Sequence, residues 1–333
     1  MITASPSGGP RWLLADWLEL EALCAKTAST SVHAINEDPL VEPNAQPDDI
    51  DEDGLREEER ISGLTAEVEA RGKMLGPSYP FRMTSDGARL ECPSTTDIGA
   101  TVYLFCLIAS HGRAGGFLNQ STVVPISDVP DLLQACATWS AAGYEQGPSY
   151  ALGLDPSPAA FLPKLAEIYA ALGDGTPVTV IPKGAPPLVK DDGIDVIAWK
   201  AMPHAKPPAT YLMAQVASGR NWEGKTVKHT IDRFHATWFA PAPACAGKPA
   251  IMIPFCIEGG PDDEDLEQDA LAMQWRRFIS KFGELFYRYT MPKYAELGLK
   301  LHADGTHVDM ADWRSRLQDF VSGVIAKLQA QCA

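Results

Sequence analysis

The sequence has no long hydrophobic run, no paired-cysteine motif and no excess of positive charge. Its longest apolar stretch, residues 100–110, is shorter than the roughly 20 residues that cross a membrane, so we expect no membrane-spanning segment. The first residues lack a basic region followed by an apolar stretch, so we expect no secretion signal. The seven cysteines are scattered without a C-x-x-C pair, which favours reduced thiols and a cytoplasmic protein.

Positive charge is scarce, because 28 lysines and arginines stand against 43 acidic residues and leave a net charge of −15. The acidity is concentrated between Glu37 and Glu59, where eleven acidic residues accompany one arginine. An acidic chain does not bind nucleic acid over its whole surface, although a local basic cleft remains compatible with it. Three prolines share this stretch, and we expect a solvated acidic linker over 36–59.

Hydrophobic periodicity divides the chain into three parts. Residues 1–150 predict a mostly helical N-terminal domain, with helices over 11–34, 55–72, 100–110 and 129–142 and a hairpin over 79–92. Residues 151–260 predict an α/β core, in the order helix 159–172, strands 178–181, 194–199 and 210–217, helix 225–240 and strand 248–257. Residues 261–333 predict a helical C-terminal extension, with helices over 266–289 and 310–331.

The informative stretch is Asp-Asp-Gly-Ile-Asp-Val-Ile-Ala-Trp at 191–199, where Asp195 enters an otherwise apolar strand. Buried carboxylates are costly unless they are paired or bind a cation. A carboxylate at the start of a strand, after a flexible glycine, is well placed to hold a hard metal ion. The next apolar strand carries one polar residue, Gln215. Two neighbouring strands therefore each present one polar side chain.

These motifs resemble the PD-(D/E)XK nuclease superfamily, and most closely its Mrr-like restriction endonuclease branch. The helix that ends at Leu172-Gly173 is similar to the first element of that branch, Asp192-Gly193-Ile194-Asp195 to its acid motif, and Gln215 to its Q-x-K strand. The resemblance covers residues 155–257. It implies a restriction-endonuclease-like core with a mixed central sheet flanked by helices. It also implies Mg²⁺-dependent hydrolysis of nucleic acid, with DNA favoured over RNA, and a role in restriction or antiphage defence.

The resemblance also implies roles for individual residues. Asp195 would ligate Mg²⁺, with help from Glu167 and from the backbone carbonyl of Val216, and Gln215 would belong to the same site. The helix position that usually holds the first glutamate is Leu162, so Glu167 is the expected substitute.

The motif lysine is also replaced, because Ala217 occupies its position two residues after Gln215. In this superfamily a neighbouring position can supply the lysine. Lys225, on the following helix, is therefore the expected catalytic lysine, and Arg220 is the second choice. The altered positions also favour an alternative, a catalytically degraded nuclease-like domain that binds nucleic acid or a protein partner without cutting.

A second alternative is a nucleotide-binding protein, since residues 219–226 read G-x-x-x-x-G-K-T after a predicted strand. Lys225 would then reach the outer phosphates and Thr226 would hold Mg²⁺. The bulky Arg-Asn-Trp-Glu and the missing acid after the strand near 250–254 weigh against this interpretation.

Two further expectations concern partners. The basic residues of the helix predicted over 266–289 either contact nucleic-acid backbone or form a solvated face; these are Arg276, Arg277, Lys281 and Arg288. The acidic balance and the motif-free first 150 residues lead us to expect a protein partner or a homo-oligomer, and no membrane.

Overall fold

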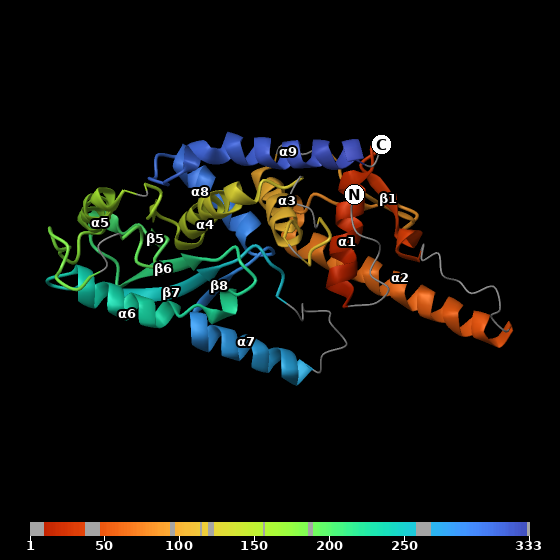
Figure 1. Ribbon diagram of the computed structural model, residues 1–333, viewed down its shortest axis with the longest axis horizontal. Coiled ribbons are helices and arrows are strands. Elements are labelled where there is room, and N and C mark those ends of the chain that lie inside the picture. Colours follow the sequence, from red (N-terminus) through yellow and green to blue (C-terminus); the bar gives the residue numbers. More distant parts are fainter. Residues whose placement is uncertain are drawn as a thin grey trace. The chain divides into compact units, whose positions relative to one another are not determined.

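The computed structural model describes residues 10–36, 47–93, 97–113, 115–118, 123–155, 157–185, 189–257 and 268–331. Within these ranges the chain is an α/β protein with nine α-helices, a five-stranded mixed sheet and a small three-stranded sheet (Figure 1). It divides into two compact units. Unit 1 comprises Met1–Ile126, Cys256–Leu271 and Gln318–Ala333, and unit 2 comprises Ser127–Phe255 and Ala272–Leu317.

Unit 1 is organised around α3 (Ile98–His111), which is buried along its whole length. This helix is apolar on every side, as expected for a central helix, and the Asp97 side chain caps it by accepting a hydrogen bond from the Ala100 amide at 2.8 Å. The other elements of the unit are α1 (Arg11–Cys24), α2 (Pro47–Leu75), the part of α9 (Arg314–Gln331) from Gln318 onward, and an antiparallel sheet of β1 (Ser29–Ser31), β3 (Arg89–Glu91) and β2 (Arg82–Met83).

The structure corrects two expectations in unit 1. The helix predicted over 11–34 ends at Cys24, because the Thr- and Ser-rich residues that follow form β1 against β3. The acidic linker predicted over 36–59 is helical from Pro47, while residues 37–46 lie outside the described part. Proline in the first turn and acidic residues near a helix N-terminus both favour helix formation, which outweighs the polar composition. The hairpin predicted over 79–92 is confirmed by β2 and β3.

Unit 2 is built on a sheet with the strand order β4-β5-β6-β7-β8. The strands are β4 (Ser149–Ala151), β5 (Val196–Ala198), β6 (Thr210–Val216), β7 (Ala246–Met252) and β8 (Glu284–Phe286). The β4–β5 and β5–β6 pairs are antiparallel, whereas β6–β7 and β7–β8 are parallel. Helix α6 (Val227–Trp238) makes the crossover that the parallel β6–β7 pair needs. The α/β class with a mixed central sheet is therefore confirmed.

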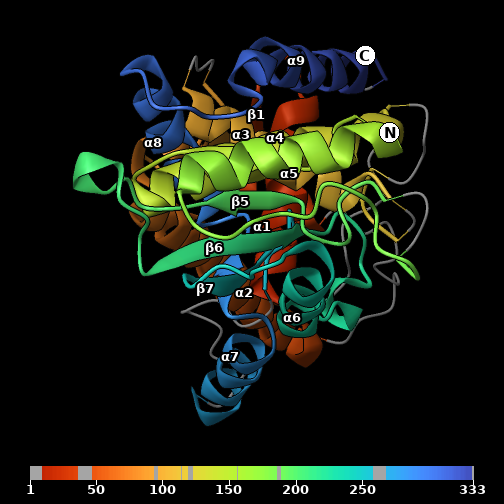
Figure 2. The ribbon, with the colours of Figure 1, turned by 90° about the vertical axis from the view of Figure 1, so that its left-hand side faces the viewer.

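Helices cover both faces of this sheet, and Figure 2 shows α4 and α6 on opposite sides of β5 and β6. Helices α4 (Val129–Glu145) and α8 (Met291–Ala303) pack backbone to backbone. A Cβ atom on Gly143 would lie 1.9 Å from the Tyr294 carbonyl oxygen, so only glycine fits there. Helix α5 (Pro158–Leu172) contacts α6, where the rings of Phe161 and Trp238 are 4.9 Å apart.

Three expectations for unit 2 are corrected. The strand predicted over 178–181 does not form, and Val180 is 72% exposed, because β4 occupies the place beside β5. The helix predicted over 266–289 ends at Phe282, since Gly283 adopts a positive φ of 80° and β8 then pairs with β7. The helix predicted over 225–240 begins at Val227, so Lys225 lies in the loop before the helix and not on it.

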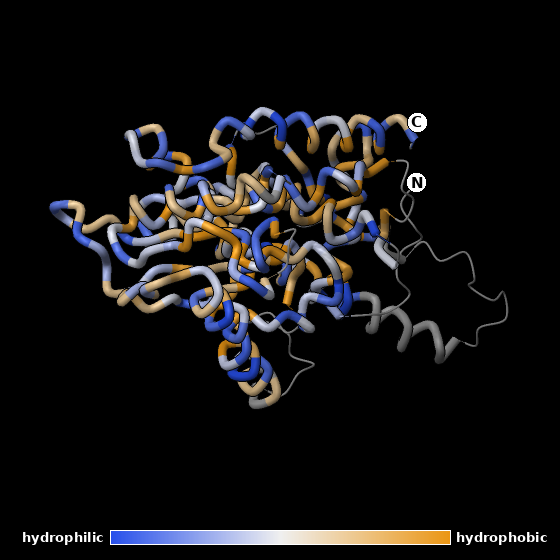
Figure 3. The backbone as a smooth tube through the Cα atoms, turned by 60° about the vertical axis from the view of Figure 1, so that its left-hand side comes forward, coloured by the Kyte–Doolittle hydropathy of each residue, from blue (hydrophilic) through white to orange (hydrophobic). Residues whose placement is uncertain are grey.

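Helix α7 (Gln268–Phe282) contacts the loop before α6, where the ring centroids of Phe278 and Trp222 are 5.2 Å apart. Its Phe278 is buried, whereas Met273 and Ile279 are more than half exposed, at 57% and 56%. Figure 3 shows the alternation of hydrophilic and hydrophobic residues along this helix. Arg276, Arg277 and Lys281 are exposed, while Arg288 is fully buried and is not available to nucleic acid.

Candidate functional site

Asp195 lies immediately before β5, at the end of a tight turn. Asp192 and Gly193 both have positive φ, and the Asp191 carboxylate accepts the Gly193 amide hydrogen at 2.6 Å, which stabilises the turn. The Asp195 Oδ2 atom accepts a hydrogen bond from the Val216 amide at 2.8 Å. The carboxylate is thereby held between the start of β5 and the end of β6.

Charged residues on both neighbouring segments of the chain act on the Asp195 carboxyl: Asp191 and Lys190 precede β5, and Lys225 follows β6. Burial raises the pKa of the Asp195 carboxyl to about 7, and the neighbouring Asp191 carboxylate raises it as well. The Val216 amide, Lys225 and Lys190 act in the opposite direction and lower that pKa. The buried Asp195 carboxylate is therefore accompanied by a second carboxylate and by two lysines, an arrangement able to bind a cation and a phosphate together.

Gln215 contributes a buried oxygen beside the same turn. Its Nε2 donates to the Gly193 carbonyl at 2.7 Å and to the Thr230 hydroxyl at 3.1 Å, which fixes the orientation of the amide. Its Oε1 is buried and has no hydrogen-bond partner among the described residues. A buried carbonyl oxygen left without a partner costs about 1–3 kcal/mol, so this position is a natural contact for a water or a cation.

Glu167 lines a cavity whose wall also includes Lys190, the residue just before this turn. The cavity measures about 430 Å³, and Gly153, Lys164, Glu167 and Lys190 are among the residues that line it. Glu167 itself is exposed and pairs with Lys164 at 3.2 Å. The wall of the cavity reaches Asp195, because the Leu152 amide donates to the Asp195 carbonyl at 2.9 Å. The structure thus places Glu167 on the cavity, paired with Lys164.

The remaining predicted residues are Val216, which ends β6, and Arg220 and Lys225, which lie in the loop after it. The Val216 amide binds Asp195, so the end of this strand adjoins the carboxylate. Lys225 is exposed in the loop before α6 and lies close enough to Asp195 to lower its pKa. Arg220 is exposed earlier in the same loop. The structure therefore places Gln215 and Val216 beside Asp195, and Lys225 near enough for its charge to act on that carboxyl.

The loop over 219–226 does not have the form of a phosphate cradle. The amides of Trp222, Gly224 and Lys225 donate to carbonyl oxygens within the loop, at 2.9–3.1 Å. The Trp222 ring is buried, with its centroid 5.2 Å from that of Phe278. Amides engaged in turns do not converge on an anion, so this geometry weighs against the nucleotide-binding alternative.

Two residues near Asp195 were missed from the sequence, Asp191 and Lys190. The only signal was the doubled aspartate before Gly193. Asp192 has a structural role instead, since its carboxylate accepts hydrogen bonds from Arg233 at 2.9 Å and from the Trp238 indole at 2.8 Å. Asp191 is therefore the second carboxylate of the candidate site.

The donors around Asp195 are hard oxygen atoms, which suit Mg²⁺. In the part of the chain that the structure describes, no group of three or more His, Cys, Asp or Glu side chains is arranged to hold a metal ion. Mg²⁺ keeps several of its waters and is commonly held through one or two carboxylates, so Asp195, Asp191 and the Gln215 oxygen fit such a sparse site.

No family model, curated protein or solved structure matches this chain. None of the described helices combines the length and the hydrophobicity of a membrane span.

Proposed function

We propose that unit 2 is a Mg²⁺-dependent nuclease that hydrolyses phosphodiester bonds, with DNA as its substrate and Asp195 at its centre. The main support for the proposal is that the Asp195 carboxylate, at the start of β5, accepts a hydrogen bond from the end of β6. The charges of Asp191, Lys190 and Lys225 act on the same carboxyl. A divalent cation would compensate the repulsion between the two carboxylates, and the lysines would compensate the charge of a phosphate.

Each residue then has a role that its position supports. Asp195 and Asp191 would bind the cation, with the unpartnered Gln215 oxygen as a third contact. The chemistry that bound Mg²⁺ supplies is polarisation of the phosphate and a lower pKa for the attacking water. Lys225 would orient that water and offset the charge that develops on the phosphate, and Lys190, which lines the cavity, would position the substrate.

A second candidate is a nuclease-like domain that binds nucleic acid or a protein without cleaving it. Leu162 and Ala217 stand at the two altered motif positions, and Glu167 is paired with Lys164. A role in restriction or antiphage defence follows from the sequence resemblance, and a cytoplasmic location from the scattered cysteines. A protein partner or homo-oligomer follows from the acidic balance and the motif-free first 150 residues, and all of these remain predictions.

Nicking of a supercoiled plasmid tests the proposal. The wild-type chain should cut in Mg²⁺ and not in EDTA, and Asp195→Asn, which keeps an acceptor for the Val216 amide, should be at least 100-fold slower, on the order of the loss of a key charged group. Asp232→Asn, which changes an exposed acid on α6, is the matched control and should cut normally. Equal cutting by Asp195→Asn would end the proposal, and DNA binding without cutting in Mg²⁺ or Mn²⁺ would establish the second candidate.

A further inference from the structure

Unit 1 contains a cavity of about 540 Å³ that the proposed nuclease site does not use. Its walls come from α1, from the chain after β3, from α3 and from the part of α9 that belongs to unit 1. This volume lies within the roughly 300–1,000 Å³ that is usual for small-molecule sites.

Helix α9 is anchored at both ends of the cavity. At one end the ring of Phe320 packs edge-on against Phe105, with centroids 5.6 Å apart. At the other end the Gln329 side-chain amide donates to the Leu23 carbonyl at 3.2 Å. The space between these two contacts is thus bounded by a helix that is fixed on both sides of it.

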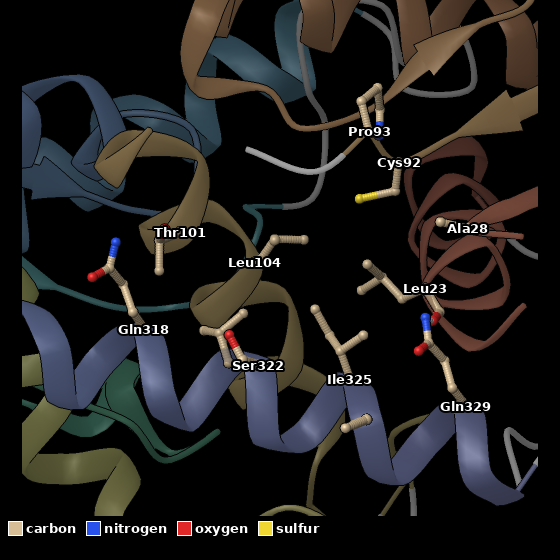
Figure 4. A pocket seen from close by; sticks show the side chains of 12 residues that line it. Leu23, Ala28, Cys92, Pro93, Thr101, Leu104, Gln318, Ser322, Ile325 and Gln329 are labelled. Atoms are coloured by element: carbon tan, nitrogen blue, oxygen red, sulfur yellow. Dashed lines mark hydrogen bonds between the residues drawn. The ribbon is translucent and has the colours of Figure 1, made fainter. Parts of the chain in front are cut away.

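The chemistry of the walls is mainly apolar. Figure 4 shows the side chains of Leu23, Leu104 and Ile325 pointing into a common space, together with the sulfur of Cys92. Gln318 and Ser322 add hydrogen-bonding groups along α9. All of the residues that the structure describes around this cavity are without formal charge.

The Cys92 thiol adds no charge to the walls of the cavity. Burial and the nearby Glu19 raise the pKa of its thiol to about 12, so the side chain is neutral at physiological pH. A thiol in this state is a polarisable contact surface rather than a nucleophile. The described walls of the cavity therefore offer packing and hydrogen bonds, without ionic contacts or a reactive thiol.

We infer that this cavity is a binding site for an uncharged, largely apolar small molecule that carries at least one hydrogen-bonding group. Apolar walls facing empty space lose dispersion contacts that a ligand of matching shape restores, whereas a charged ligand would lose its hydration without compensation. The Gln318 and Ser322 side chains, at one end of the cavity, would receive the polar group.

The test uses Nile red, an uncharged apolar fluorophore, titrated with the full chain. Wild type should bind it saturably at one site, and Ala326→Trp, which fills the cavity from α9, should weaken binding at least 10-fold. Ala330→Trp introduces the same ring at an exposed alanine of α9 that does not line the cavity, and it should bind like wild type. Ser322→Phe is a second filling variant, to be used if Ala326→Trp shifts the unfolding midpoint.

Three outcomes would overturn the inference: no saturable binding by wild type, equal loss in the Ala326→Trp and Ala330→Trp chains, or no loss in a filling variant. The first of these is also the result expected if the cavity is occupied by another part of the chain or by a second copy. Plasmid nicking in the same variants should remain unchanged, so this test fails or succeeds independently of the nuclease proposal.

Discussion

The Asp195 carboxylate accepts the amide hydrogen of Val216 at 2.8 Å, which joins the start of β5 to the end of β6 through a side chain. This contact fixes the position of the carboxylate while leaving it beside Asp191 and Lys225. The same residue thus joins two strands of the sheet and lies at the centre of the candidate site.

The first prediction concerns stability against pH in EDTA. The folded state raises the pKa of Asp195 from 3.8 to about 7, so its protonated form is favoured in the folded protein. Its contribution to the free energy of unfolding is therefore fully present below pH 4 and is lost as the pH rises to 7. The change is on the order of 4 kcal/mol at most, from about 1.4 kcal/mol per pKa unit.

Asp195→Asn cannot ionise and should lack this loss. Urea unfolding between pH 4 and pH 8 should show the variant gaining stability relative to wild type as the pH rises. Parallel pH profiles for the two proteins would contradict the buried, desolvated carboxyl described here.

The second prediction decides between the two candidate cations of the loop after β6. Lys225→Met should lower the rate of Mg²⁺-dependent cleavage by about 100-fold or more, because a positioned charge near the phosphate is lost. Arg220→Met should change the rate less than 10-fold, since it is Lys225 whose charge acts on Asp195. Both residues are exposed, so neither change should alter folding by more than about 0.5 kcal/mol. A larger loss in Arg220→Met would transfer the role to that arginine.

The third prediction concerns a buried ion-pair network in unit 1. Arg71 is fully buried and donates to Asp16 and Glu19, both at 2.8 Å, and to Glu67 at 2.7 Å. Arg71→Met would leave these carboxylates without their shared cation and should destabilise the protein by about 3–5 kcal/mol in urea unfolding.

The matched control for that change is Arg316→Met. Arg316 is 46% exposed and lies 3.8 Å from Asp128, so its replacement should cost about 0–1 kcal/mol. Similar losses for the two variants would show that the Arg71 network contributes no more than a surface pair.

Elements with strong helical periodicity were predictable from the sequence, as α3, α4, α5 and α6 show. Among the short strands, the hairpin of β2 and β3 and the strand β5 were also predicted, whereas β1, β4 and β8 were not. In β8 the apolar spacing of the preceding helix continues through Phe286, and only pairing with β7 makes this segment a strand. Residues 178–181 have the composition of a strand but remain outside the sheet, where β4 pairs with β5 instead.

The candidate site was also predictable only in part. Asp195 and Gln215 stand out as polar residues in apolar strands, and this pattern is visible in one dimension. Asp191 and Lys190 come close to Asp195 because the chain turns at Asp192-Gly193. The segment around Gly153 also packs against this turn, so closely that a Cβ on Gly153 would lie 2.9 Å from Asp191 Oδ2. Such long-range approaches are set by packing and have no local signal.

The central claim is that Asp195 binds a divalent cation, and counting bound Mn²⁺ by electron paramagnetic resonance tests it most directly. At pH 8 the wild-type chain should bind one Mn²⁺ in competition with Mg²⁺, more tightly than at pH 6, because the carboxylate must lose its proton to bind a metal. Asp195→Asn should lose this site, whereas Asp232→Asn should keep it. An unchanged Mn²⁺ site in Asp195→Asn would contradict the account.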